Sequence, residues 1–109
     1  MKLLMVVIHH RDARRLRDQF IEADLRFTEL GSTGGFLREG SVTFMLGVDG
    51  EQVEQVVGMV RQTCPPREEV AMVATPGAQL YHNPVGEGLT VTIGGAQIFQ
   101  LAMERMISV

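Results

Sequence analysis

An α+β fold, in which two helices cover one face of a single antiparallel sheet, is the architecture that this sequence predicts. The chain has 109 residues, which is enough for one domain over residues 1–109 with a core of its own. Its apolar residues recur every second position in some segments and every three to four positions in others. Turn-forming residues separate these segments, which follow one another as strand, helix, strand, strand, helix and strand.

The first half of the chain predicts a strand, a helix and two more strands. Residues 3–8 are apolar at every position, as is typical of a strand covered on both faces. Asp12 is the predicted cap of a helix with one apolar side. That side consists of Ala13, Leu16, Phe20 and Ala23. Residues 25–30 and 41–48 alternate between apolar and polar side chains, so they predict two strands joined by the loop 31–40.

The second half predicts another helix and three short strands. Asp49 and Gln52 have the spacing of a capping box, and the helix that follows carries an apolar stripe as far as Cys64, where Pro65 and Pro66 end it. Residues 70–74 predict a fourth strand, and residues 75–88 form a long loop rich in proline and glycine. Residues 89–93 and 97–101 predict a hairpin around Gly94 and Gly95.

This order is the ferredoxin-like βαββαβ pattern with an extra C-terminal hairpin. Two helices can cover only one face of the sheet. The other face receives apolar side chains from the fully apolar first strand, so we expect a further copy of the chain to cover it. The sequence therefore favours a homo-oligomer.

Composition narrows the possible partners. Thirteen acidic and ten basic side chains give a net charge of −3, which argues against a protein that holds long nucleic acids by charge but not against one small anionic ligand. The basic residues of segment 11–17 are better explained as a solvated helix face than as an anion-binding patch. No apolar run approaches the ~20 residues of a membrane span, and HHRDARR follows the short apolar opening where a signal peptide would have its cleavage site. We expect a cytoplasmic protein that contacts no membrane.

Catalytic and metal-binding patterns are weak. His9 and His10 are adjacent and point to opposite faces if extended, with no third ligand at metal-site spacing. Cys64 is the only cysteine and lies on the buried stripe of its helix, so neither a disulfide nor a cysteine metal cluster is expected. No serine, histidine or aspartate lies in a recognisable local motif of a catalytic triad. The prediction is a binding protein without cofactor or metal, and not an enzyme.

The loop GSTGGFLREG, residues 31–40, is the main candidate for a binding element. Its glycines are similar to those of phosphate-binding loops, yet the lysine of those loops is missing and strands lie on both sides, so a plain turn stays open. Phe36 either stacks on a flat ligand such as a nucleobase or packs under the loop. Arg26 and Thr28 share one strand face, where a guanidinium and a hydroxyl can meet a phosphate or remain in solvent.

Several segments resemble the PII-like cyclic di-AMP receptors. They are MKLLMVVI at the start, Arg26-Phe27-Thr28, STGGFLREG, the GV of residues 47–48, CPPRE and VTIGGAQIF. The resemblance covers nearly the whole chain, and STGGFL followed by arginine is its most specific part. It implies a signalling protein with ferredoxin-like subunits, assembled as a trimer, that binds cyclic di-AMP in the clefts between subunits. The loop with STGGFL would close over the ligand, and residues 75–88 would lie beside it and shift on binding.

The same resemblance implies the ligand-binding residues. They are Arg26, Thr28, Gly35, Phe36, Leu37 and Gly47. Phe36 would pack against an adenine, Thr28 would bond its polar edge, and Arg26 would lie close to the ligand.

Three positions of the chain differ from the pattern. Asp24 and Ser41, which we include in the predicted site, stand where the family usually has asparagine, and Ser108 stands where it has glutamine. Because an ionised aspartate only accepts hydrogen bonds, a second interpretation keeps the trimer and changes the ligand to another adenine nucleotide or a small metabolite. A third interpretation, a small ferredoxin-like enzyme or metal-tolerance trimer, requires an acid/base pair or a metal site in the cleft. A downstream protein partner is expected, but no motif identifies it.

Overall fold

A computed structural model describes residues 1–31, 40–71 and 89–109 of the chain. Two helices and six strands lie in these ranges. In chain order they are β1 (Lys2–His9), α1 (His10–Glu22), β2 (Thr28–Gly31), β3 (Ser41–Val48), α2 (Gly50–Thr63), β4 (Arg67–Ala71), β5 (Leu89–Ile93) and β6 (Ala96–Ala102).

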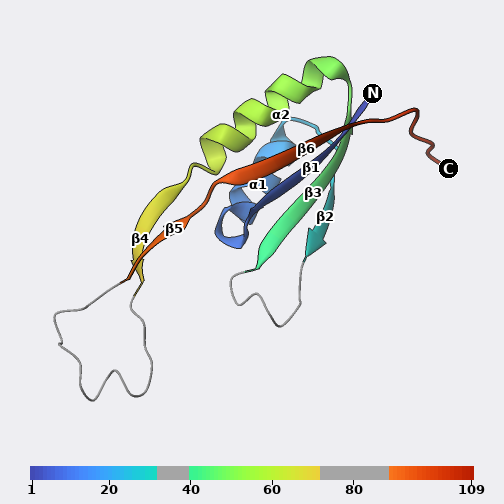
Figure 1. Ribbon diagram of the computed structural model, residues 1–109. Helices are drawn as coiled ribbons and strands as arrows, with labels where there is room; N and C mark the ends of the chain where they lie inside the picture. Colours follow the sequence, from blue (N-terminus) through green and yellow to red (C-terminus); the bar gives the residue numbers. More distant parts are fainter. Residues whose placement is uncertain (32–39, 72–88) are drawn as a thin grey trace, which may run out of the picture.

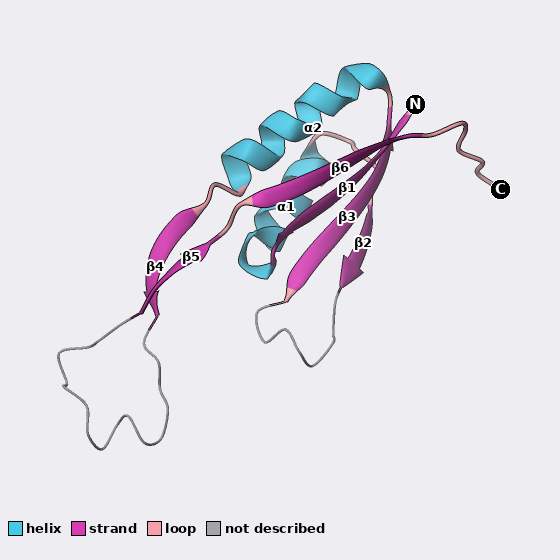
Figure 2. Ribbon diagram, viewed as in Figure 1, coloured by secondary structure: helices cyan, strands magenta, loops and turns pink. Residues whose placement is uncertain are grey.

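The main layer is a four-stranded antiparallel sheet in the order β2-β3-β1-β6, with both helices on one face (Figures 1 and 2). β1 lies in the interior of the sheet because β3 and β6 pair with it on either side. The α+β prediction is confirmed, and the strand order is that of a ferredoxin-like sheet with β6 in the place of the fourth strand.

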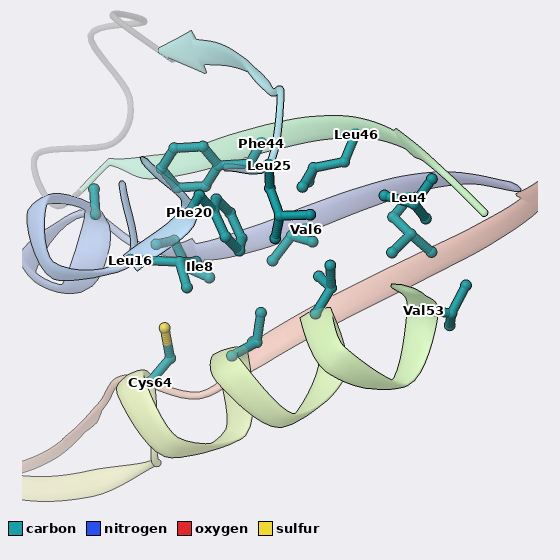
Figure 3. Close-up of a cluster of buried hydrophobic side chains, with 14 residues drawn as sticks. Leu4, Val6, Ile8, Leu16, Phe20, Leu25, Phe44, Leu46, Val53 and Cys64 are labelled. Atoms are coloured by element: carbon teal, nitrogen blue, oxygen red, sulfur yellow. The ribbon is translucent and has the colours of Figure 1, made fainter. Parts of the chain in front are cut away.

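The core lies between the sheet and the two helices. Leu4, Val6 and Ile8 of β1 are buried at every second position, which the alternation of a strand requires. Figure 3 shows these side chains meeting those of β3, α1 and α2 in one cluster. Phe20 of α1 packs edge-to-face on Phe44 of β3, with ring centroids 5.5 Å apart, in the favourable geometry for two aromatic rings.

The start of α1 differs from the prediction. The cap is His9, whose Nδ1 accepts a hydrogen bond of 3.2 Å from the backbone N–H of Arg11, and not Asp12. Asp12 lies in the first helical turn and is fully buried, because two arginine side chains bind its carboxylate. The capping contact at the other helix is present, since the Asp49 N–H donates to Oε1 of Gln52 at 3.0 Å.

The first residues of the predicted strand 25–30 belong instead to the end of α1. The backbone N–H of Asp24 bonds the carbonyl of Ile21, and that of Leu25 bonds the carbonyl of Phe20. These two bonds form a Schellman motif. In this motif the residue after the helix cap, here Asp24, adopts a left-handed conformation, and its φ is 57°. The strand therefore begins only at Thr28, although Leu25 is buried and Arg26 exposed as the alternation predicts.

The predicted C-terminal hairpin is wrong. β5 pairs with β4 in a separate two-stranded sheet, which we call the ribbon, whereas β6 pairs with β1. Gly94 and Gly95 have φ values of 82° and 77°, but they bend the chain between two sheets, and Figure 1 shows β5 leading on into β6. The pairing with β1 lets Ile98 pack on the core, which a β5–β6 hairpin would not provide. The predicted fourth strand, 70–74, is described only to Ala71, which lies in the ribbon and not in the main sheet, and the predicted loop 75–88 lies outside the described residues.

The face of the main sheet opposite the helices, here called the open face, is largely apolar. The strand register places on it Leu3, Met5, Val7, Leu30, Met45, Phe99 and Leu101, together with Thr28, Ser41, Thr43, Gly47 and Gln97. Leu30, Phe99 and Leu101 are 44%, 52% and 46% exposed. The expected apolar second face is thus present, and no described helix covers it.

Candidate functional site

Five of the predicted site residues lie in the described part of the chain: Asp24, Arg26, Thr28, Ser41 and Gly47. Gly35, Phe36 and Leu37 lie outside it.

Thr28 and Gly47 lie near each other at one end of the open face. Thr28 is opposite Met45 in the β2–β3 register, and Gly47 is two residues further along the same strand. Both positions therefore lie on the open face as diagonal neighbours, and diagonal positions on paired strands are ~7–8 Å apart. Asp24 and Arg26 precede Thr28 and are exposed. This end of the sheet brings together a hydroxyl, a guanidinium and a strand position without a side chain.

Ser41 lies at the opposite end of the same face. It pairs with His9, at the point where β3 begins and the loop 31–40 ends. Ser41 and Gly47 are six positions apart in β3, a distance of roughly 20 Å. Within one subunit, the predicted site residues are therefore divided between the two ends of the open face.

The C-terminal segment that follows β6 covers Gly47. A methyl group added to Gly47 would lie 3.2 Å from Cε of Met103 and 3.3 Å from Sδ of Met106. The Met103 N–H also bonds the carbonyl of Met1, which holds the segment against the sheet. Sequence reasoning missed these two methionines, although a glycine inside a strand often marks the close approach of another segment and was the available signal.

A charged cluster lies on the helix side of the molecule. Arg67 donates to Asp12 from both terminal nitrogens, with Nη2–Oδ1 at 2.9 Å and Nη1–Oδ2 at 3.3 Å, and Arg15 donates to Oδ1 at 2.8 Å. Burial alone raises the pKa of Asp12, but the hydrogen bonds and charges of the two arginines outweigh it and hold that pKa below its ordinary value. Asp12 is therefore a structural anion at neutral pH.

Cys64 lies beside this cluster at the end of α2. Burial, with a further contribution from the Asp12 charge, raises the pKa of its thiol to about 11. The thiol is thus protonated and weakly nucleophilic at neutral pH. It also lines a mostly apolar groove of about 340 Å³ between α2 and β6, which includes Val57, Pro66 and Ile98 and none of the predicted site residues.

The described residues offer no group of three histidine, cysteine, aspartate or glutamate side chains that could hold a metal ion. Neither described helix is long and apolar enough to cross a membrane.

Comparison with known proteins identifies relatives of this chain. A sequence model of the cyclic-di-AMP receptor family matches residues 1–109. The chain belongs to the cyclic-di-AMP receptor family. A match over the whole length shows that both ends of the open face, and the loop between β2 and β3, are parts of one family domain.

A solved structure extends the comparison. The chain is similar to a functionally unknown protein from Pediococcus pentosaceus ATCC 25745, with 32% sequence identity and a TM-score of 0.73. The alignment covers 99% of this chain and 96% of that one. This member of the cyclic-di-AMP receptor family therefore shares its whole fold with that protein.

Proposed function

We propose that the protein is a PII-like signal-transduction protein that binds cyclic di-AMP in clefts between the subunits of a homotrimer. Membership of the cyclic-di-AMP receptor family supports cyclic di-AMP as the ligand. The position of the ligand between subunits is supported by one observation. Thr28, Ser41 and Gly47 share the open face with the exposed apolar side chains. A subunit that covers those side chains would also border the predicted site.

The division of the site supports a cleft between subunits. Ser41 and the loop end lie roughly 20 Å from Gly47 along β3, and Thr28 lies near Gly47. A neighbouring subunit can bring the loop end of one chain close to the Thr28 end of another. Binding would then depend on assembly, and the signal would be a rearrangement of the loops at the cleft.

The residues indicate binding and not catalysis. An exposed guanidinium at Arg26 can meet a phosphate with two parallel hydrogen bonds, and the hydroxyl of Thr28 can donate to or accept from an adenine edge. Asp12 and Cys64, which have shifted pKa values, lie on the helix side and away from these residues. The protein would accordingly act without cofactor or metal.

Isothermal titration calorimetry with cyclic di-AMP, ATP, ADP and cyclic AMP tests the ligand. We expect saturable heat with cyclic di-AMP at one molecule per subunit. Binding of another adenine nucleotide in preference to cyclic di-AMP would favour the second candidate, a trimer of the same kind with a different ligand. The exposed carboxylate of Asp24 beside Arg26 is the feature that favours this candidate, because it adds negative charge where a di-anionic ligand would lie.

Arg26→Gln tests the site. Because a hydrogen bond to a charged group contributes about 1.5–3 kcal/mol, the variant should weaken cyclic di-AMP binding by roughly tenfold or more. Arg14→Gln is the matched control, since Arg14 is an exposed arginine on α1. Equal affinities for the two variants would remove Arg26 from the site.

A further inference from the structure

The ribbon joins the rest of the molecule at the ends of α2 and β6, and we call this junction, which includes Cys64, Arg67, Ile93 and Gly95, the root. β4 and β5 pair with each other and with no strand of the main sheet, and Figure 1 shows them extending beyond the ends of α2 and β6. Contacts at the root involve Arg67 of β4, the buried Ile93 of β5, and a backbone bond of 2.9 Å from the Gly95 N–H to the Cys64 carbonyl. The direction of the ribbon depends on these contacts.

Asp12 is the binding partner of the ribbon at this root. Its carboxylate is fully buried and receives both terminal nitrogens of Arg67, whose side chain is 31% exposed. A pair of parallel hydrogen bonds between a guanidinium and a carboxylate fixes orientation as well as distance. Arg15 binds the same carboxylate and so helps hold it in place.

The guanidinium of Arg67 is also confined by its surroundings. Its Nη1 donates to the Pro65 carbonyl at 3.3 Å. A methyl group on Gly94 would lie 2.8 Å from Nη1 and 2.4 Å from the Pro65 oxygen. Arg67 therefore has little room to move unless the ribbon moves with it.

The same turn of α1 contacts the end of the predicted ligand loop. The His10 N–H donates to the Gly40 carbonyl at 3.1 Å, and His9 pairs with Ser41. Only one residue, Arg11, separates His10 from Asp12. One helical turn, His9–Asp12, thus contacts the loop end at one position and the ribbon at another.

We propose that this turn couples the ligand loop to the ribbon, with Asp12 as the positioning residue that holds the ribbon through Arg67. The coupling rests on the proposed function in one respect, namely that a ligand at the loop displaces Gly40 and Ser41. A displacement there would reach Asp12 through the first turn of α1, and the confined Arg67 would carry it into β4. Asp12 itself touches no ligand.

Hydrogen–deuterium exchange followed by mass spectrometry tests the hold on the ribbon without any ligand. Removing one partner of a buried ion pair is strongly destabilising, so Asp12→Asn should speed amide exchange in residues 67–71 and 89–93 by about tenfold or more. Because the same change also lowers global stability, the effect on the ribbon is the rise in its exchange beyond the rise measured in β1 and β3. Asp18→Asn, an exposed change on the same helix, is the matched control and should leave ribbon exchange unchanged.

Arg67→Lys provides a second variant in case Asp12→Asn does not fold. Lysine keeps the charge but loses the two-point geometry, so ribbon exchange should still rise, by about threefold. If the ribbon exchanges at the wild-type rate in a folded Asp12→Asn or Arg67→Lys protein, the hold is refuted.

Saturating cyclic di-AMP then tests the coupling. In the wild type, the ligand should change ribbon exchange, and in Asp12→Asn it should bind but leave the ribbon exchange unchanged. A ribbon that still responds in Asp12→Asn overturns the coupling while the proposed function stands. If wild-type protein does not bind cyclic di-AMP, the proposed function and the ligand-driven coupling fail together, and the exchange measured without ligand still decides whether Asp12 holds the ribbon.

Discussion

Asp24 occupies a backbone conformation that its side chain does not favour. Its φ of 57° is left-handed, and the two backbone bonds around it close the end of α1 on the buried pair Phe20 and Leu25. Only glycine adopts this conformation without a steric cost, and asparagine adopts it more readily than most residues. The backbone therefore gives a reason for asparagine at this position that is independent of any ligand.

Asp24→Gly should stabilise the protein by roughly 0.5–1 kcal/mol, because relief of the left-handed strain exceeds the added entropy of the unfolded chain. Asp24→Asn should have a smaller effect of the same sign. Urea unfolding of the ligand-free protein measures both. Asp18→Gly is the opposite control, since glycine inside a helix should cost a few tenths of a kcal/mol relative to aspartate (roughly 0.3 kcal/mol). A loss of stability in Asp24→Gly would contradict the assignment.

Cys64 predicts a specific dependence of stability on alkaline pH. Its thiol has an ordinary pKa of 9.0 when unfolded and about 11 when folded. The folded state thus binds the proton more tightly, so this contribution to stability is complete below pH 9 and is lost as the pH rises to 11. At pH 10 the loss should be roughly 1 kcal/mol.

Urea unfolding at pH 8 and pH 10 should show this loss in the wild type, and Cys64→Ala should lack that part of it. Native Cys64 should also react slowly with a thiol reagent at pH 8 and rapidly once the protein is unfolded. Fast labelling of the native protein would show that the thiol is neither buried nor protonated.

At the scale of elements, the two glycines Gly58 and Gly94 should respond to alanine in opposite ways. Gly58 lies inside α2 with open space where a Cβ would be, so Gly58→Ala should stabilise by about 0.8–1 kcal/mol. Gly94 has φ = 82°, and its Cβ would lie 2.4 Å from the Pro65 oxygen, so Gly94→Ala should destabilise by roughly 2 kcal/mol or more. Thermal unfolding of the two variants gives the comparison, and equal shifts would contradict the geometry of the root.

The elements that depend on local pattern were predictable from the sequence. The alternation in β1 and β3, the stripes of α1 and α2, and the contact of Gln52 with Asp49 all follow from residues a few positions apart. The pairing of β6 with β1 was not, because Gly94 and Gly95 are equally compatible with a hairpin and with a bend between two sheets. That choice depends on the burial of Ile98 by residues distant in the chain.

In the candidate site, too, contacts between residues distant in the chain were not predictable from the sequence. The burial of Leu25 and the exposure of Arg26 and Thr28 agree with the alternation, although Arg26 precedes β2 and does not lie on a strand. The role of Asp12 was not predictable, because its partner Arg67 is 55 positions away, and a buried carboxylate and a helix cap look alike in sequence. The resemblance to known receptors supplied Gly47, whereas its cover by Met103 and Met106 depends on how the C-terminal segment folds back.

At the scale of the whole molecule, the open face decides whether the chain acts alone. Phe99 and Leu101 of β6, with Leu30 of β2, leave large apolar side chains about half exposed on one face. Apolar side chains gathered on one sheet face are typical of protein–protein contacts, and the described helices cover only the other face. In the proposed trimer, neighbouring subunits would cover this face.

We therefore expect sedimentation velocity to give a mass three times the 12.0 kDa of the chain. Phe99→Asp should dissociate this assembly, because a carboxylate buried among Met5 and its neighbours on the open face would lack a partner. Ile21→Asp is the matched control, since Ile21 is 61% exposed on α1, on the other side of the sheet, and should leave the trimer intact. Loss of cyclic di-AMP binding in Phe99→Asp but not in Ile21→Asp would show that the ligand requires assembly. A wild-type monomer, or a Phe99→Asp protein that remains trimeric and binds normally, would place the contact between subunits elsewhere.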